Sequence, residues 1–184
     1  MQTYQLIFFL LSTTVLLGIS RRSLRDPHHH GFYRFIAWEI IIIQIAIHLP
    51  TWFVNPLRWN QLISWLLLLI SVLVVSAGFH YLRSYGGRGA RKVKSSNYEI
   101  ENTTHLVTRG IYGYIRHPIY CSLLFFVMGV FFKSLSVIGG ILALLAVEFV
   151  YLTAKVEEKE NIQTFGSEYL EYMKTSKMFI PAVI

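Results

Sequence analysis

The sequence predicts an all-α fold: an integral membrane helical bundle of about five transmembrane helices with a C-terminal helical cap on the cytosolic side. Hydrophobic residues make up 54% of the chain and charged residues only 15%, whereas a soluble domain carries about 25% charged residues. The charge deficit is concentrated in a few long apolar stretches, and the segments between them are mostly basic. A length of 184 residues fits one domain, so residues 1–184 are taken as a single membrane domain.

Five apolar stretches predict the membrane spans, because a transmembrane helix needs about 20 apolar residues, with a range of about 17 to 25. The first, 4–20, lacks a basic start and a small-residue cleavage pattern, so we interpret it as a span and not as a removed signal peptide. The other predicted spans are 35–54, 62–82, 118–132 and 135–153. Only Lys133 and Ser134 separate the last two, which predicts a tight helical hairpin.

The distribution of lysine and arginine predicts the orientation of the chain in the membrane. One side receives Arg21, Arg22, Arg25 and Arg34, then the residues 83–116 and the C-terminal tail, and the other side receives only Arg58 and Lys133. Because basic residues accumulate on the cytoplasmic side, we expect the N-terminus outside and the C-terminus in the cytoplasm.

The net charge of +7 fits either nucleic acid or an anionic membrane surface as partner. The apolar stretches favour the membrane, so we expect membrane lipids as partners and no nucleic acid. Residues 83–104 form a polar basic stretch with three glycines, Gly86, Gly87 and Gly89. This pattern predicts a flexible loop, which we interpret as a contact for anionic lipid in preference to a phosphate-binding site.

The C-terminal tail predicts the helical cap. Five residues recur at spacings of 4, 3, 4 and 3 and so share one helical face: Glu158, Ile162, Phe165, Tyr169 and Tyr172. We expect the last membrane helix to continue into the cytosol, to turn at Gly166, and to restart as a short helix capped by Ser167. The aromatic stripe is then expected against the membrane face of the bundle.

Two polar motifs at the cytosolic side are candidates for chemistry. Arg116 and His117 precede Pro118, which suits the first turn of a helix. The start of a helix favours anions, although Arg116 alone could also serve as an anchor among lipid headgroups. Glu157 and Glu158 follow the last span, and their carboxylates can accept hydrogen bonds from a ribose diol or pair with a cation.

The combination of these motifs resembles the isoprenylcysteine carboxyl methyltransferase family. The resemblance rests on THLVTRGIY at 104–112, RHPIY at 116–120, the glutamate pair 157–158, FGSEYLEY at 165–172 and FIP at 179–181, within about the C-terminal 45% of the chain. It implies a helical membrane enzyme that uses S-adenosylmethionine. It also implies a cofactor pocket open to the cytosol and a second substrate that enters from the lipid.

The resemblance also implies roles for individual residues. The implied cofactor-binding residues are Thr104, His105, Leu106, Val107, Tyr112, His117, Pro118, Ile119, Tyr120 and Glu157. Arg116 and Glu157 are the expected catalytic residues. Such enzymes usually carry an arginine at the acceptor, four residues before the glutamate, where this chain has Thr153. Thr153 and Glu148 are therefore the candidate substrate contacts, and we expect a lipophilic, membrane-dissolved acceptor without claiming a prenylcysteine carboxylate.

Other polar residues are weaker candidates. His28, His29 and His30 form a histidine tract, but no second ligand cluster accompanies it and Cys121 is the only cysteine, so no metal site is expected. Ionisable groups in or near spans are costly and often functional, and the chain has four: Glu39, His48, His80 and Glu148. Glu148 could contact the substrate or bond to a neighbouring helix.

Two other kinds of function are alternatives to methyl transfer. A membrane reductase of sterols or related lipids would use NADPH and has a similar C-terminal region, but such reductases are generally longer. A non-enzymatic membrane scaffold or transporter subunit has no need for polar residues that converge on one cytosolic pocket. A methyltransferase needs no metal and, with a carboxylate acceptor, no base, which agrees with the absence of a clear catalytic dyad.

Overall fold

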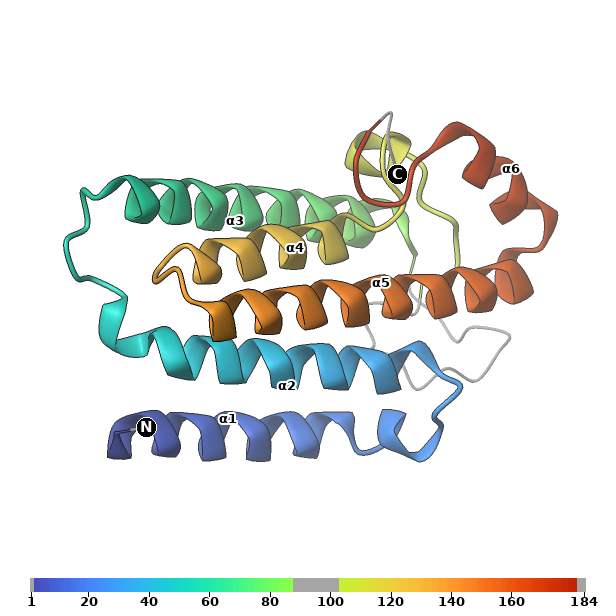
Figure 1. Ribbon diagram of the computed structural model, residues 1–184. Helices are drawn as coiled ribbons and strands as arrows, with labels where there is room; N and C mark the ends of the chain where they lie inside the picture. The colour runs from blue at the N-terminus through green and yellow to red at the C-terminus, as the bar shows by residue number, and fades with distance from the viewer. Residues whose placement is uncertain (1, 88–102, 182–184) are drawn as a thin grey trace.

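The computed structural model describes residues 2–87 and 103–181, and within these residues the regular structure is helical throughout (Figure 1). The α-helices are α1 Thr3–Ser20, α2 His30–His48, α3 Trp59–Tyr85, α4 Pro118–Phe131, α5 Val137–Phe165 and α6 Ser167–Thr175. Three short 3-10 turns complete the set: η1 Ser23–Arg25, η2 Leu49–Thr51 and η4 Gly110–Gly113. The predicted all-α bundle is confirmed.

The helices lie side by side in the order α1, α2, α5, α4, α3, and neighbours in this order contact each other (Figure 1). The N-terminus and the α2–α3 and α4–α5 connections lie at one end, which we call the Lys133 end. Helix α6, η4 and the C-terminal part of the described chain lie at the other, which we call the α6 end. The termini therefore lie at opposite ends, as expected for five helices in sequence.

Four helical segments are long and apolar enough to cross a membrane: α1, α2 with η2, α3 and α5. The fifth, α4, has 14 residues, which at 1.5 Å per residue is about 21 Å and shorter than a hydrocarbon core of about 30 Å. The predicted span at 118–132 is thus a shorter apolar helix, which packs against α3 and α5.

The helix boundaries differ from the predicted spans where local capping decides them. Helix α2 begins at His30, before residue 35, because the His29 side chain accepts the N–H of Gly31. Helix α5 runs on to Phe165, and Gly166, with φ 61°, turns the chain into α6. The extended last helix and the turn are confirmed. Capping by Ser167 was wrong, because Ser167 is the first residue of α6 and Gly166 is the cap.

The predicted basic loop at residues 83–104 is described only at its two ends. Helix α3 continues to Tyr85, and residues 88–102 lie outside the described residues.

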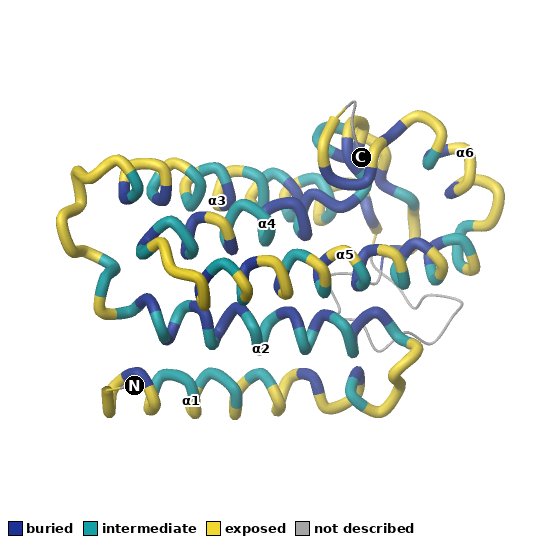
Figure 2. The backbone as a smooth tube through the Cα atoms, in the orientation of Figure 1, coloured by how far each residue is buried: buried dark blue, intermediate teal, exposed yellow. Residues whose placement is uncertain are grey.

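The outer surface of the bundle is apolar, as expected of helices that face lipid. Exposed and partly exposed residues run along α1 and α3 (Figure 2), and large side chains on the outside are exposed, for example Leu11 at 63% and Leu144 at 72%. Apolar surface of this extent is not typical of a water-soluble monomer. The distribution of exposed residues therefore supports an integral membrane protein.

Polar groups within the helices bond mainly to backbone carbonyls of neighbouring helices. Ser64 donates to the carbonyl of Gly129 at 2.6 Å, and Ser71 donates to that of Ser122 at 2.8 Å. The His48 ring lies 3.0 Å from the carbonyl of Ser134, and Glu39 accepts a hydrogen bond from Thr13. Such bonds stabilise helix association in lipid, which accounts for Glu39 and His48, two of the ionisable residues noted in the sequence.

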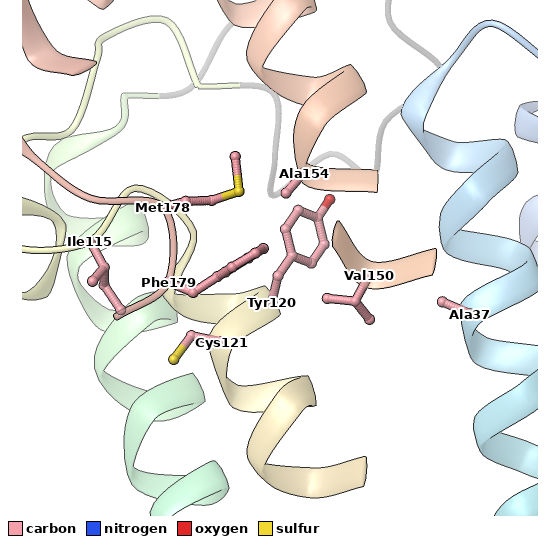
Figure 3. Packing of buried hydrophobic residues seen from close by; sticks show 8 residues of the cluster. All are labelled: Ala37, Ile115, Tyr120, Cys121, Val150, Ala154, Met178 and Phe179. Atoms are coloured by element: carbon pink, nitrogen blue, oxygen red, sulfur yellow. The ribbon is translucent and has the colours of Figure 1, made fainter. Parts of the chain in front are cut away.

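The C-terminal segment, residues 176–181, is held against the start of α4. The N–H of Arg116 donates to Lys177 O at 2.7 Å, and that of Lys177 donates to Tyr114 O at 3.0 Å. Figure 3 shows Met178 and Phe179 reaching from this segment toward Tyr120, which belongs to α4. The segment thereby fixes the position of α4, where the candidate polar motif begins.

Candidate functional site

A cavity opens at the α6 end between elements that are far apart in the sequence. Its lining comes from α3, η4, the starts of α4 and α6, the end of α5, and the chain before η4. The lining residues are Leu82, Thr103, Leu106, Val107, Tyr112, Arg116, His117, Pro118, Ile119, Tyr120, Glu157, Asn161, Phe165, Tyr169 and Tyr172. Together with the open space at its mouth, the cavity measures about 630 Å³.

A buried ion pair holds the cavity together. The Nε of Arg116 donates to Glu158 Oε1 at 2.8 Å, and the two side chains are 9% and 5% exposed. Nη1 of Arg116 also donates to the carbonyls of Met173 and Ser176. Arg116 thus joins the start of α4 to α5, to α6 and to the C-terminal segment, and its burial excludes an anchor among lipid headgroups.

The two adjacent glutamates have different roles because successive helical residues point about 100° apart. Glu158 is buried against Arg116 and does not line the cavity. Glu157 lines the cavity, and its carboxylate accepts a hydrogen bond from the Tyr120 hydroxyl. No lysine, arginine or histidine of the described chain pairs with Glu157. Its negative charge is therefore available to a ligand.

His117 supplies a second polar group in the cavity. Its ring stacks on Tyr120, with centroids 5.5 Å apart and planes at 26°, and its Nε2 lies 3.8 Å from Glu158. This buried nitrogen makes no hydrogen bond within residues 2–87 and 103–181. An unsatisfied buried nitrogen that lines a cavity is a candidate ligand contact.

Tyrosines form part of the cavity wall from α6. Tyr169 and Tyr172 are buried, and burial raises the pKa of both phenols well above the usual range, so they remain neutral. The Tyr172 hydroxyl donates to the carbonyl of Tyr112 at 2.6 Å. This bond ties α6 to η4 across the cavity.

Most of the cofactor residues implied by the motifs converge on this cavity. Eight of the ten line it, and the exceptions are Thr104 and His105. Both of these are exposed, and their backbone N–H groups donate to Gly86 O at 2.9 and 3.1 Å. They anchor the chain before η4 to the end of α3.

Other lining residues were not expected from the motifs: Leu82, Thr103, Asn161, Phe165, Tyr169 and Tyr172. The spacing of Phe165, Tyr169 and Tyr172 predicted a shared face but assigned it to the membrane face of the bundle. Their contribution to the cavity depends on how Gly166 turns α6. Leu82 and Thr103 carry no motif that could have indicated them.

The candidate substrate contacts lie on α5, outside the cavity lining. Thr153 is 1% exposed, and its hydroxyl donates to the carbonyl of Phe149 at 2.6 Å. Glu148 is exposed on the outer side of α5, among apolar residues such as Leu144 and Leu145. The two residues therefore do not meet at one point.

In the structure the carboxylate of Glu160 lies beside the histidine tract, which the sequence did not indicate. His29, His30 and Glu160 bring possible ligand atoms within 4.8 Å of one another. Glu160 accepts from the backbone N–H of His30 at 2.9 Å and contacts its ring Nδ1 at 2.7 Å. Because His29 Nδ1 accepts the N–H of Gly31, its proton lies on Nε2, toward Glu160. The contacts are those of a hydrogen-bonded junction between the start of α2 and α5.

The cavity can bind a ligand that combines a positive charge, hydroxyl groups and a flat ring. The Glu157 carboxylate can accept hydrogen bonds from a diol or attract a cation. The rings of Tyr112, Tyr120 and Phe165 can stack on a base or face a cation.

A comparison of the sequence with protein families gives one match. The model of the family described as phospholipid methyltransferase matches residues 59–168, more than half of the chain. The matched region begins with α3 and ends just inside α6, so it contains most of the cavity lining. No curated protein and no solved structure matches the chain.

Proposed function

The chain belongs to the phospholipid methyltransferase family, a family of membrane methyltransferases, and from this premise we propose that it transfers a methyl group from S-adenosylmethionine to a lipophilic acceptor dissolved in the membrane. The family match agrees with the resemblance to isoprenylcysteine carboxyl methyltransferases drawn from the motifs. One observation carries the proposal: two sequence blocks, around residues 104–120 and 157–172, converge on one cavity that is lined by Glu157, whose carboxylate pairs with no cation of the described chain.

Glu157 is the proposed anchor of the cofactor. Its carboxylate lines the cavity and accepts a hydrogen bond from the Tyr120 hydroxyl. His117 Nε2 offers a second polar contact. When bound, S-adenosylmethionine supplies an activated methyl group on a sulfonium, so the chain needs neither a metal nor a covalent intermediate.

In the proposed reaction the protein positions the two reactants and excludes water from them. Methyl transfer requires the acceptor atom at roughly 3 Å from the methyl carbon and in line with the leaving sulfur. Arg116 holds α4, α5 and the C-terminal segment in fixed positions around the cavity. The apolar rings of the wall exclude water from the reacting centre. Arg116 acts on the cavity mainly as a positioning residue, with Nε and Nη1 engaged.

The acceptor is proposed to reach the cavity from the lipid. The lining from α3 and α4 includes apolar residues, Leu82 and Ile119, and at the α6 end the described chain outside the membrane helices is too small for a separate acceptor site. Thr153 stands where the related enzymes usually direct an arginine at the acceptor. The nearest cation on that helix, Lys155, extends outward over Tyr151. A prenylcysteine carboxylate therefore lacks its usual partner.

A substitution tests the choice of acceptor. Thr153→Arg restores the arginine, and we expect methylation of a farnesylated cysteine analogue to appear only in the variant. High activity of the native protein on that analogue, unchanged by Thr153→Arg, would overturn the argument from Thr153. Folding of the variant is checked by thermal unfolding, because Thr153 is buried.

The proposed orientation places the α6 end in the cytoplasm, where S-adenosylmethionine is available. The excess of lysine and arginine at this end supports it. A reporter fused after Ile184 should be active only in its cytosolic form. Periplasmic or lumenal reporter activity would contradict the orientation.

Cofactor binding distinguishes the proposed function from a reductase and from a scaffold. Purified protein in detergent is titrated calorimetrically with S-adenosylmethionine, S-adenosylhomocysteine and NADPH. We expect saturable binding of the first two compounds and none of NADPH. Binding of NADPH alone would indicate a reductase, and binding of no compound would indicate a scaffold; either result refutes the proposal.

A further inference from the structure

A second cavity lies at the Lys133 end, on the other side of the bundle from the proposed cofactor site. It is formed by the α2–α3 connection, the start of α3 and the α4–α5 connection. The lining residues are Thr51, Val54, Asn55, Arg58, Trp59, Asn60, Gln61, Lys133, Ser134 and Leu135. Together with the open space at its mouth, this cavity measures about 730 Å³.

Lys133 is a buried cation without an anionic partner in the described chain. The residue is 2% exposed, and its Nζ donates to Gln61 Oε1 at 3.1 Å. The same Nζ lies 3.1 Å from the ring centroid of Trp65 and 5.3 Å from that of Trp52. Burial lowers the pKa of Lys133 to about 8. Its partners are all neutral, so its charge is not balanced.

The charge around this cavity is positive only. Arg58 and Lys133 are the only charged residues within 49–60 and 132–136, and neither segment contains an aspartate or a glutamate. The two cations assigned to this side of the membrane by the sequence therefore line the same cavity. Two cations at one cavity with no carboxylate repel each other, and an anion between them removes the repulsion.

The surroundings of the cavity suit the headgroup region of a bilayer. Apolar and aromatic side chains beside it are exposed, with Phe53 at 75%, Leu57 at 83% and Trp59 at 61%. Exposed residues of this kind settle at the boundary between headgroups and acyl chains. A bilayer whose boundary lies at these residues would bring its lipid phosphates to the cavity.

We propose that this second cavity binds a phosphate group between Arg58 and Lys133, from an anionic lipid headgroup of that leaflet or from a free phosphate ion. Arg58 is an exposed residue of the cavity lining, and Lys133 is a buried one. Asn55 adds a polar side chain to the lining. The site does not depend on the proposed methyl transfer, because it lies at the other end of the bundle.

Tryptophan fluorescence gives a direct readout of binding. Of the four tryptophans in the chain, Trp59 lines the cavity, and Trp52 and Trp65 contact Lys133. Protein in an uncharged detergent is titrated separately with dihexanoyl phosphatidylglycerol, with inorganic phosphate and with dihexanoyl phosphatidylcholine. We expect a saturable change with phosphatidylglycerol or phosphate. A response to phosphatidylglycerol alone identifies a lipid headgroup, and a response to both identifies phosphate as sufficient.

Arg58→Gln is the decisive variant, because Arg58 is exposed and its loss should not affect folding. We expect it to weaken binding about tenfold or more, as for the loss of a charged hydrogen bond. The matched control is Arg25→Gln, which removes an exposed arginine at the α6 end and should bind as the native protein does. Lys133→Met should weaken binding at least as much as Arg58→Gln.

Three results would overturn the proposal. The first is that neither phosphatidylglycerol nor phosphate gives a saturable change in fluorescence, and the second is that the native protein and Arg58→Gln bind with equal affinity. The third is that phosphatidylcholine gives the same response as phosphatidylglycerol and that Arg58→Gln does not alter it. The last result would mean that only the acyl chains bind.

Discussion

Buried charged side chains are paired at the α6 end of the bundle, whereas the cations at the Lys133 end have no carboxylate partner in the described chain. At the α6 end Arg116 is buried against Glu158, and Glu160 contacts His29 and His30. At the Lys133 end the buried ammonium of Lys133 contacts an amide and two indole rings. Paired charges join helices to one another, whereas an unbalanced charge beside a cavity indicates a ligand of opposite sign.

The comparison extends to Glu157, a carboxylate at the α6 end that pairs with no cation of the described chain. Glu157 faces its cavity with only the neutral Tyr120 as a described partner. One cavity thus has an unbalanced negative charge, suited to a sulfonium or a diol, and the other an unbalanced positive charge, suited to a phosphate. Three variants test this contrast, and a fourth tests the turn that positions α6 at the first cavity.

The largest effect is expected from breaking the paired charges. Glu158→Ala leaves Arg116 buried without a carboxylate, which costs about 3–5 kcal/mol of stability. Thermal unfolding in detergent measures the loss. Glu171→Ala is the control, because Glu171 pairs with Lys174 at an exposed site and such pairs contribute about 0–1 kcal/mol. Equal losses in the two variants would show that the buried pair does not hold the α6 end together.

A smaller effect is expected at the turn between α5 and α6. Gly166 has φ 61° and ψ −132°, and a Cβ there would meet no atom within 4 Å. Gly166→Ala should therefore destabilise the protein only through backbone strain, by about 1–3 kcal/mol. It should also weaken cofactor binding, because α6 carries Tyr169 and Tyr172 of the cavity wall.

Gly140→Ala provides the control for the turn. Gly140 lies within α5, and its Cβ would meet Phe131 only at an ordinary distance of 3.6 Å. Here the change should be neutral or should stabilise by up to about 1 kcal/mol. Shifts of the same sign in both glycine variants would contradict the role assigned to Gly166.

The smallest effect on stability is expected at the Lys133 end. Lys133→Met keeps the length of the side chain and removes a buried charge that has no carboxylate to leave behind. The lost contacts with Gln61 and the two indoles are offset by the relief of desolvation, so stability should change by about 1 kcal/mol or less. A loss as large as that of Glu158→Ala, measured in the same unfolding assay, would make Lys133 a structural residue and remove the contrast between the ends.

Much of the fold could be predicted from the sequence because hydropathy and capping act locally. The apolar stretches predicted α1, α3 and α5 close to their observed positions, and Gly166 predicted the turn before α6. The start of α2 was placed too late because the cap formed by His29 is a side-chain contact that hydropathy does not register. Local patterns also could not show that α4 stops after 14 residues.

The site was only partly predictable because it is assembled from distant segments. The motifs indicated Glu157, Tyr120 and His117, which the structure brings to one cavity. The pairing of Lys177 with the chain before α4, and that of His30 with Glu160, join segments about 60 and 130 residues apart. No periodicity within one segment carries such information. The two cavities, which depend on these long-range contacts, became visible only in three dimensions.

The affinity of Glu157→Gln for S-adenosylmethionine tests the central claim most directly. The substitution keeps the size of the side chain and an oxygen for the Tyr120 hydroxyl, and removes only the negative charge that faces the cavity. Calorimetric titration should show binding about 10- to 100-fold weaker than in the native protein, as for the loss of a charge-assisted hydrogen bond. Glu171→Gln, at an exposed site on α6, should bind as the native protein does. Unchanged affinity in Glu157→Gln would contradict the account, because the cofactor would then not bind at this carboxylate.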